Sequence, residues 1–224
     1  IEQSNGDILA FIDSGITVRP QWAENVLDEM NDRECDYLGY DVTLTTSENP
    51  TIWERYERAF SFPMDRYLRE DNFTGAGALV VRKQVITEVG GFDSQIESGG
   101  DREFGRRVHN AGFRQCFSDQ IRSYHPARKT REELTQKAKR IGRGHVQLRR
   151  RSSDTHIAHP LHPFRFLPPS PFRMHRQLAH SENPKYRYAL FYLIEYYLKL
   201  IQTAYIQWYL LSMREHIPVD GEQS

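Results

Sequence analysis

Near the start of the chain, five apolar residues follow one another without interruption. This run is Ile-Leu-Ala-Phe-Ile at 8–12, and it ends at Asp13-Ser14-Gly15. A continuous apolar run closed by turn residues is typical of a strand that is buried on both faces, as in a parallel sheet. We therefore predict a buried strand at 8–12 and a turn directly after it.

Helical spacing of apolar residues follows in two places. The first segment begins after Pro20 and places four apolar side chains on one face: Trp22, Val26, Leu27 and Met30. The second runs from Asp101 to Ala111 and is followed by Gly112, at the position where glycine commonly ends a helix. Both segments are predicted to be helices.

The rest of the first 145 residues continues this alternation of strands and helices. Further strands are predicted at 37–44, 73–82 and 113–124, and further helices at 51–70, 83–89 and 130–141. Strands that alternate with helices predict an α/β fold.

The C-terminal third has a different pattern. Residues 157–184 contain six of the eleven prolines and predict an extended linker. Residues 186–213 form one long apolar and aromatic helix, interrupted by a polar stripe of Glu195, Lys199 and Gln202. Glu195 and Lys199 are four residues apart, so they can pair on one face. An interfacial helix in the plane of a membrane fits this pattern best, and a spanning helix and a helix docked on a soluble domain are the alternatives.

Charge divides the chain, although its formal net charge is zero. Residues 126–151 carry ten Lys/Arg and two Asp/Glu, whereas residues 1–125 carry thirteen and twenty-two. A solvated surface and a nucleic-acid contact are two interpretations of the basic stretch, but no groove-reading motif accompanies it. Because the aromatic helix follows, we expect an anionic membrane surface as the partner and no nucleic acid.

The two cysteines, Cys35 and Cys116, lie far apart in the sequence. Their spacing indicates neither a zinc site nor a disulfide framework. We expect reduced thiols and a cytosolic setting. The N-terminus has no pattern of a signal peptide.

Three side chains that can perform chemistry stand at the ends of predicted elements. Asp13 ends a strand, where α/β sheets bind ligands, and its carboxylate can coordinate Mg²⁺ or Mn²⁺. Asp101 follows Gly99-Gly100 and can act as a general base. His125 ends the strand at 113–124 and can bind a metal or a phosphate. The plainer interpretations are a turn or helix cap for each carboxylate and a structural role for the histidine.

Taken together, these residues form an ordered series of motifs over residues 1–145. The series is the strand that ends at Asp13, then Pro20 and Trp22, Thr74-Gly75, Gly90-Gly91-Phe92-Asp93, Gly99-Gly100-Asp101, Arg106-Arg107, Ala111-Gly112 and His125. This order resembles the second half of the catalytic domain of family 2 glycosyltransferases.

The resemblance implies a GT-A fold, which is a mixed sheet flanked by helices, here with a C-terminal helical extension. It implies transfer of a sugar from a nucleotide-sugar donor to an acceptor hydroxyl with inversion. Asp101 matches the general base, and Asp13 matches the first Asp of the DxD metal site. Asp13 and His125 are the expected ligands of Mg²⁺ or Mn²⁺. The expected donor- and acceptor-binding residues are Asp13, Thr74, Gly75, Gly100, Arg106 and Arg107.

The chain departs from the family pattern at two points. Gly15 replaces the second Asp of DxD. The first half of the family's domain has no counterpart, so we expect the chain to be truncated. The expected organisation is a partial GT-A domain at 1–145, a basic and Pro-rich linker at 146–185, and an amphipathic or transmembrane helix at 186–213.

Three functional hypotheses follow. The favoured one is an enzyme at the cytoplasmic face of a membrane that glycosylates a glycan or a lipid-linked acceptor. The second is a non-catalytic remnant that serves as a membrane-associated interaction module. The third is a nucleic-acid-binding protein that uses the basic stretch.

Overall fold

The computed structural model describes residues 1, 3–60, 62–151, 162–178 and 187–214. The chain divides into two compact units. The first comprises residues 1–94 and 99–131, and the second comprises residues 95–98 and 132–224. Residues 95–98 thus belong to the second unit, although the chain on either side of them belongs to the first.

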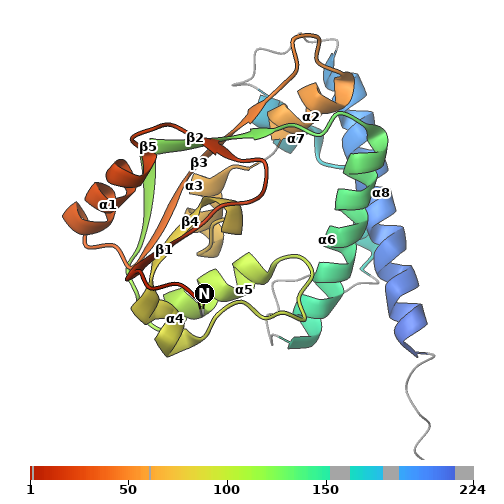
Figure 1. Ribbon diagram of the computed structural model, residues 1–224. Coiled ribbons are helices and arrows are strands. Elements are labelled where there is room, and N and C mark those ends of the chain that lie inside the picture. The colour runs from red at the N-terminus through yellow and green to blue at the C-terminus, as the bar shows by residue number, and fades with distance from the viewer. Residues whose placement is uncertain (2, 61, 152–161, 179–186, 215–224) are drawn as a thin grey trace, which may run out of the picture. The chain divides into compact units, whose positions relative to one another are not determined.

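A five-stranded mixed sheet forms the centre of the first unit (Figure 1). Its strands lie in the order β1-β4-β3-β5-β2. Their bounds are β1 Ile8–Phe11, β2 Thr17–Val18, β3 Tyr37–Thr45, β4 Leu79–Arg82 and β5 Gln115–Pro126. Among the described strands, only β3 and β5 pair in parallel, and the other pairs are antiparallel. The mixed α/β fold expected from the sequence is confirmed.

Two apolar clusters cover the two faces of this sheet. Val80 points into one cluster, with Trp22, Val26 and Met30 of α1 (Trp22–Asp32). The residues on either side of Val80 in β4 point into the second cluster. This cluster also includes the helix residues Val85, Ile86, Phe104 and Val108. The two-residue period of a strand explains this division, because neighbouring side chains point to opposite faces.

Strand β1 differs from its prediction. It pairs only with β4, antiparallel, and lies at one edge of the described sheet. Ala10 is exposed and Ile12 is 43% exposed. An apolar run shows that a strand can be buried on both faces, but it does not determine which strands pair with it.

Two helical predictions also change in detail. Leu27 of α1 is 46% exposed, because the buried stripe of this helix follows only the four-residue spacing of Trp22, Val26 and Met30. The single helix predicted at 51–70 is two helices, α2 Ile52–Phe60 and α3 Met64–Asp71. Pro63 lies between them, and proline is not tolerated in a helix interior.

The two helices after β4 agree with their predictions. They are α4 Lys83–Val89 and α5 Gly100–Asn110. Gly112 has a φ of +84° and donates its N–H to the His109 carbonyl, while Phe113 donates to the Val108 carbonyl. These two bonds form a Schellman motif, in which glycine adopts the left-handed conformation without steric cost.

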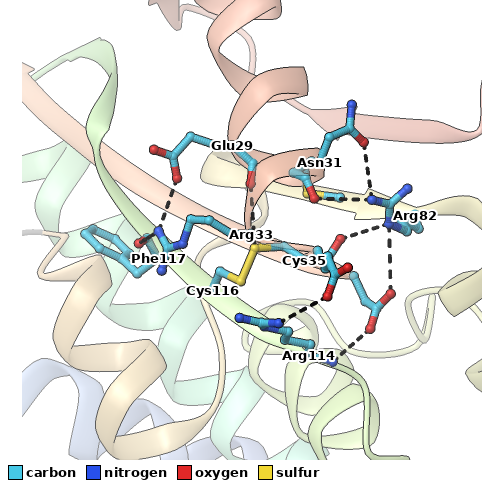
Figure 2. The surroundings of a disulfide bond; sticks show 11 residues. Glu29, Asn31, Arg33, Cys35, Arg82, Arg114, Cys116 and Phe117 are labelled. Atoms are coloured by element: carbon cyan, nitrogen blue, oxygen red, sulfur yellow. Dashed lines mark hydrogen bonds and ion pairs between the residues drawn. A yellow bond between two sulfur atoms is a disulfide. The ribbon is translucent and has the colours of Figure 1, made fainter.

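A disulfide joins Cys35 and Cys116 in the core beside β3 and β5 (Figure 2). The expectation of two reduced, unpaired thiols is wrong for this structure. The residues are 81 positions apart in sequence, but the parallel register places Cys116 opposite Leu38, near the start of β3. Sequence spacing cannot reveal a pairing that strand register creates.

The second unit is helical. Its elements are α6 Arg131–Arg151, the short 3₁₀ helix η2 Pro163–Arg165, α7 Pro171–Leu178 and α8 Arg187–Arg214. Helix α6 covers all of the basic stretch after residue 130 and buries Leu134, Ala138, Val146 and Leu148. Within the expected linker, residues 171–178 are helical, while residues 152–161 and 179–186 lie outside the described part of the chain.

Helix α8 is a single long helix, as predicted, and its polar side chains contact neighbouring backbone. The hydroxyls of Tyr192 and Tyr196 donate to the carbonyls of Pro169 and Phe166, each at 3.0 Å. The Lys199 ammonium donates to two carbonyls of the same segment, one of them that of Leu167 at 2.7 Å. Among the described helices, none combines the length and apolarity that crossing a bilayer requires.

Candidate active site

The carboxylates of Asp13 and Asp101 both approach the short glycine segment that leads into β4. A Cβ atom placed on Gly77 would lie 2.7 Å from Oδ2 of Asp13, and one on Gly75 would lie 3.8 Å from Oδ2 of Asp101. Because Gly75 and Gly77 are only two residues apart, the two carboxylates face the same stretch of backbone. Glycine permits this close approach because it has no side chain.

A tight turn holds Asp13 beside this segment. The register pairs Phe11 of β1 with Leu79 of β4, so the end of β1 lies next to the start of β4. The Ile16 N–H donates to the Asp13 carbonyl at 3.2 Å, and Gly15 has a φ of +88°. The predicted turn is confirmed, and Gly15, in the place of the second Asp of the motif, provides the left-handed conformation.

Asp101 lies in the first turn of α5 and is half-buried. Gly99, with a φ of +89°, occupies the N-cap position, and Gly100 is the first helical residue. Oδ1 of Asp101 accepts a hydrogen bond from the Arg102 N–H at 2.9 Å. Asp101 is therefore not the N-cap itself, which was its plainer interpretation, although its charge still suits the positive end of the helix.

Two buried tyrosines of β3 contact the backbone of the glycine segment and of the residue before it, and no pattern in the local sequence indicated this role. The Tyr37 hydroxyl accepts a hydrogen bond from the Thr74 N–H at 2.8 Å, and the Tyr40 hydroxyl donates to the Gly77 carbonyl at 3.4 Å. Burial raises the pKa of both hydroxyls above the ordinary value, and the charge of the nearby carboxylate, Asp101 for Tyr37 and Asp13 for Tyr40, raises it further. Both tyrosines therefore remain protonated over the physiological pH range.

Thr74 directly precedes the glycine segment. Its side chain is fully buried, and its hydroxyl donates to the Met64 sulfur at 3.5 Å. The Thr74 side chain also contacts Gly39 of β3, where an added Cβ would lie 3.0 Å from the threonine Cβ. This packing gives Thr74 a structural role under the glycine segment, and its part in donor binding remains a prediction.

The two arginines predicted to bind substrate differ in their surroundings. Arg107 pairs with Glu103 at 2.6 Å and also donates to the carbonyls of Val89 and Gly91, which holds the end of α4 against α5. Burial lowers the pKa of Arg106, as does the like charge of Arg102. The Arg107 guanidinium is therefore already bound by protein groups. Substrate roles for both arginines remain predictions.

The residues present fit a divalent metal only in part. Asp13 offers a carboxylate oxygen, which Mg²⁺ and Mn²⁺ prefer. Nδ1 of His125 lies 2.7 Å from the Pro126 carbonyl oxygen, so this nitrogen already has a partner. Across the described residues, no group of three or more His, Cys, Asp or Glu side chains is arranged to hold a metal.

The known proteins with similar sequences belong to one class of enzyme. No protein-family model matches the chain. The chain is 33% identical over 148 residues to glycosyltransferase AglE of Haloferax volcanii, which covers 66% of this chain and 48% of that protein. It is also 33% identical over 117 residues to the pre-mycofactocin glycosyltransferase of Mycobacterium tuberculosis, which covers 48% of this chain and 24% of that protein.

The fold is similar to that of a solved glycosyltransferase. The mannosyltransferase PcManGT from Pyrobaculum calidifontis, solved in complex with GDP-Man and Mn²⁺, superposes with a TM-score of 0.51 at 12% identity. The match covers 92% of this chain and 64% of that one. The chain is therefore related in sequence to proteins named glycosyltransferases, as its motifs predicted. It spans about half the length of AglE and about a quarter of the mycobacterial relative.

Under the donor-binding role that the sequence predicts for Asp13, replacing Gly77 with alanine is expected to weaken the binding of a nucleotide sugar about tenfold, a typical loss for one hydrogen bond to a charged group. The new Cβ would meet Oδ2 of Asp13 at 2.7 Å, and the carboxylate would have to move away. Isothermal titration calorimetry with nucleotide sugar, with and without Mn²⁺, measures the change. Gly6→Ala is a matched control, because its new Cβ would lie 3.4 Å from the nearest atom, an ordinary contact. Equal affinities of both variants would contradict a role for Asp13.

Proposed function

We propose that the protein containing this chain is an inverting family 2 glycosyltransferase of GT-A type, which uses a nucleotide-sugar donor. The observation that carries the proposal is the convergence of Asp13 and Asp101 on the Gly75–Gly77 segment. One carboxylate would serve the donor and the other the acceptor. The sequence relationship to glycosyltransferases supports the class, and the solved mannosyltransferase supports the fold.

Asp101 acts as the general base in this proposal. Its carboxylate accepts the proton of the acceptor hydroxyl as the hydroxyl oxygen attacks the anomeric carbon. The bond from this carbon to the diphosphate breaks, and the nucleoside diphosphate leaves with the electron pair. Because attack and departure occur on opposite faces, the anomeric configuration inverts. The acceptor is proposed to be a glycan or a lipid-linked sugar.

Asp13 holds the donor side of the proposed site. A Mg²⁺ or Mn²⁺ ion, when bound, would neutralise charge on the diphosphate. Asp13 is the proposed protein ligand of this ion, and His125 is the second ligand expected from the sequence. The absence of a side chain at Gly77 lets the Asp13 carboxylate lie directly against the backbone at this end of the segment.

The experiment that tests the proposal is a donor panel with the full-length protein. Nucleotide sugars are first screened for binding and then for release of nucleoside diphosphate, with and without Mn²⁺ and with candidate acceptors. Binding and turnover of one donor class support the proposal and identify the sugar. Failure of every nucleotide sugar to bind would contradict it and favour a non-catalytic interaction module.

The second unit is proposed to attach the enzyme to the anionic cytoplasmic face of a membrane. Large apolar side chains are exposed on the η2–α7 segment and on α8: Phe164 67%, Phe172 77%, Leu193 62%, Trp208 55% and Leu211 62%. Helix α6 ends in Arg149, Arg150 and Arg151. Apolar side chains beside basic ones suit the interface of an anionic bilayer.

The double variant Phe164→Ser/Phe172→Ser is expected to bind anionic vesicles about tenfold more weakly, because each phenylalanine would otherwise bury apolar surface among the lipids. Sedimentation with phosphatidylglycerol vesicles measures this affinity. Leu27→Ser serves as a control, because Leu27 is 46% exposed on α1 in the first unit. An unchanged affinity of the double variant would show that this segment does not contact the membrane.

A further inference from the structure

A proline-rich segment, residues 163–172, lies along helix α8 within the second unit, and side chains of the helix hold its backbone. The donors recur every three or four residues and so share one stripe of α8. They are Tyr188, Tyr192, Tyr196, Lys199 and Thr203. The acceptors are the backbone carbonyls of Phe164, Arg165, Phe166, Leu167, Pro169 and Pro171, at 2.5 to 3.3 Å.

Most N–H groups of the same segment are absent or bonded locally. Four of its ten residues are prolines, which have no N–H: Pro163, Pro168, Pro169 and Pro171. The N–H groups of Phe164, Arg165 and Phe166 donate to His162 or Pro163. A backbone group that leaves water without a partner costs free energy, and here most have partners within the protein. This backbone can therefore enter a medium of low polarity at a small cost.

The large apolar side chains of the segment are exposed. Four of them are each at least 50% exposed: Phe164, Phe166, Leu167 and Phe172. Because the backbone that carries them is held on α8, little ordering is needed when they are buried by a partner. The segment therefore presents a pre-arranged apolar surface.

Positive charge lies beside these apolar side chains. Arg165 belongs to the segment, and burial together with the like charge of Arg149 lowers the pKa of its guanidinium. The two cations are close enough to repel each other, so an anion beside them would be stabilising. An anionic bilayer offers negative headgroups next to an apolar layer, which matches both properties of the segment.

We propose that residues 163–172 insert at the boundary between the headgroups and the acyl chains of an anionic bilayer, while the stripe of α8 keeps their carbonyls bonded. This inference rests on the membrane attachment proposed above and not on sugar transfer. It assigns the polar stripe a role that the sequence did not suggest. Lys199 and the tyrosines hold the inserting segment, because a carbonyl needs a partner where water is scarce.

A depth measurement in the full-length protein tests the insertion. The fluorophore nitrobenzoxadiazole is attached to Phe172→Cys without reductant. On phosphatidylglycerol vesicles its emission is expected to shift to the blue, and a nitroxide on the upper acyl chain should quench it more strongly than one on the headgroup. The same fluorophore on Leu27→Cys is the control, because Leu27 is 46% exposed on α1 in the first unit. It should show neither effect.

The double variant Tyr192→Phe/Tyr196→Phe tests the stripe. It removes the donors to the Pro169 and Phe166 carbonyls and makes α8 more apolar. Apolar burial alone would predict equal or stronger insertion. Loss of the two hydrogen bonds is instead expected to lower the equilibrium constant for insertion about tenfold, measured as acyl-chain quenching of the Phe172 probe against lipid concentration. Tyr209→Phe removes a hydroxyl from α8 outside the stripe and should insert as the wild type does.

The outcomes separate the inference from the proposal on which it rests. Vesicle binding without preferential acyl-chain quenching at Phe172 would overturn the insertion alone, whereas no vesicle binding would refute the membrane attachment itself. Undiminished insertion of the double variant would overturn the role of the stripe, and if that variant does not fold, Tyr192→Phe alone decides. A blue shift without lipid that grows with protein concentration would identify a second copy of the chain as the occupant and overturn the proposal.

Discussion

Replacing Asp101 with asparagine is expected to lower kcat by about 10²- to 10⁴-fold, the usual contribution of a positioned general base. Asparagine has nearly the same shape, but its amide cannot accept the proton of the acceptor hydroxyl. It can still accept the hydrogen bond from the Arg102 N–H through its carbonyl oxygen, so the start of α5 should be retained. Steady-state kinetics with the donor found in the panel measure the loss.

The affinity for the donor separates this effect from general damage. The dissociation constant of the nucleotide sugar should change little in Asp101→Asn, because Asp13, at the other end of the glycine segment, is the residue proposed to hold the donor. Asp65→Asn is a suitable control: this carboxylate is 50% exposed on α3 and pairs with Arg69. A kcat of Asp101→Asn within threefold of wild type would remove Asp101 from the mechanism.

Removal of the disulfide is expected to give the largest loss of stability. In the chain-entropy model, a link between residues 81 positions apart stabilises the fold by about 4 kcal/mol, because it restricts the unfolded chain. Cys35→Ser/Cys116→Ser should therefore lower the free energy of unfolding by up to this amount. Urea unfolding of the wild type and the variant measures it.

Reductant provides the control for this experiment. Treatment with reductant should destabilise the wild type by a similar amount and leave the double serine variant unchanged. Because the two cysteines are 0% and 6% exposed, the reduction should be carried out on the unfolded protein before refolding. Two free thiols in the unfolded, non-reduced protein would contradict the disulfide. They would instead support the reduced, cytosolic state expected from the sequence.

Local sequence features predicted the elements on which the site is built. The turn at Asp13, the helix that carries Asp101 and the Schellman end at Gly112 all depend on residues within a few positions of one another. Turn-forming residues, glycines and helical periodicity act over that range, so a single sequence is enough to indicate them. The motif order also predicted the class of protein, which the relatives confirm.

Features that depend on strand register were not predicted. The placement of β1 at a sheet edge, the pairing of Cys35 with Cys116 and the support of the glycine segment by Tyr37 and Tyr40 all arise from residues distant in sequence. Tyr37 and Tyr40 appear in the sequence as ordinary aromatic residues of a strand. Only their hydroxyl partners reveal a connection to the proposed site.

The sequence by itself therefore determined the α/β class, most element positions and the two carboxylates, because these follow from local periodicity and motif order. The tertiary structure alone decided which strands pair, where both carboxylates converge, and that Glu97 pairs with Arg143. The physical reason is that side chains 37 to 81 residues apart meet only after the chain has folded, and nothing in their local sequence indicates which partner each will find.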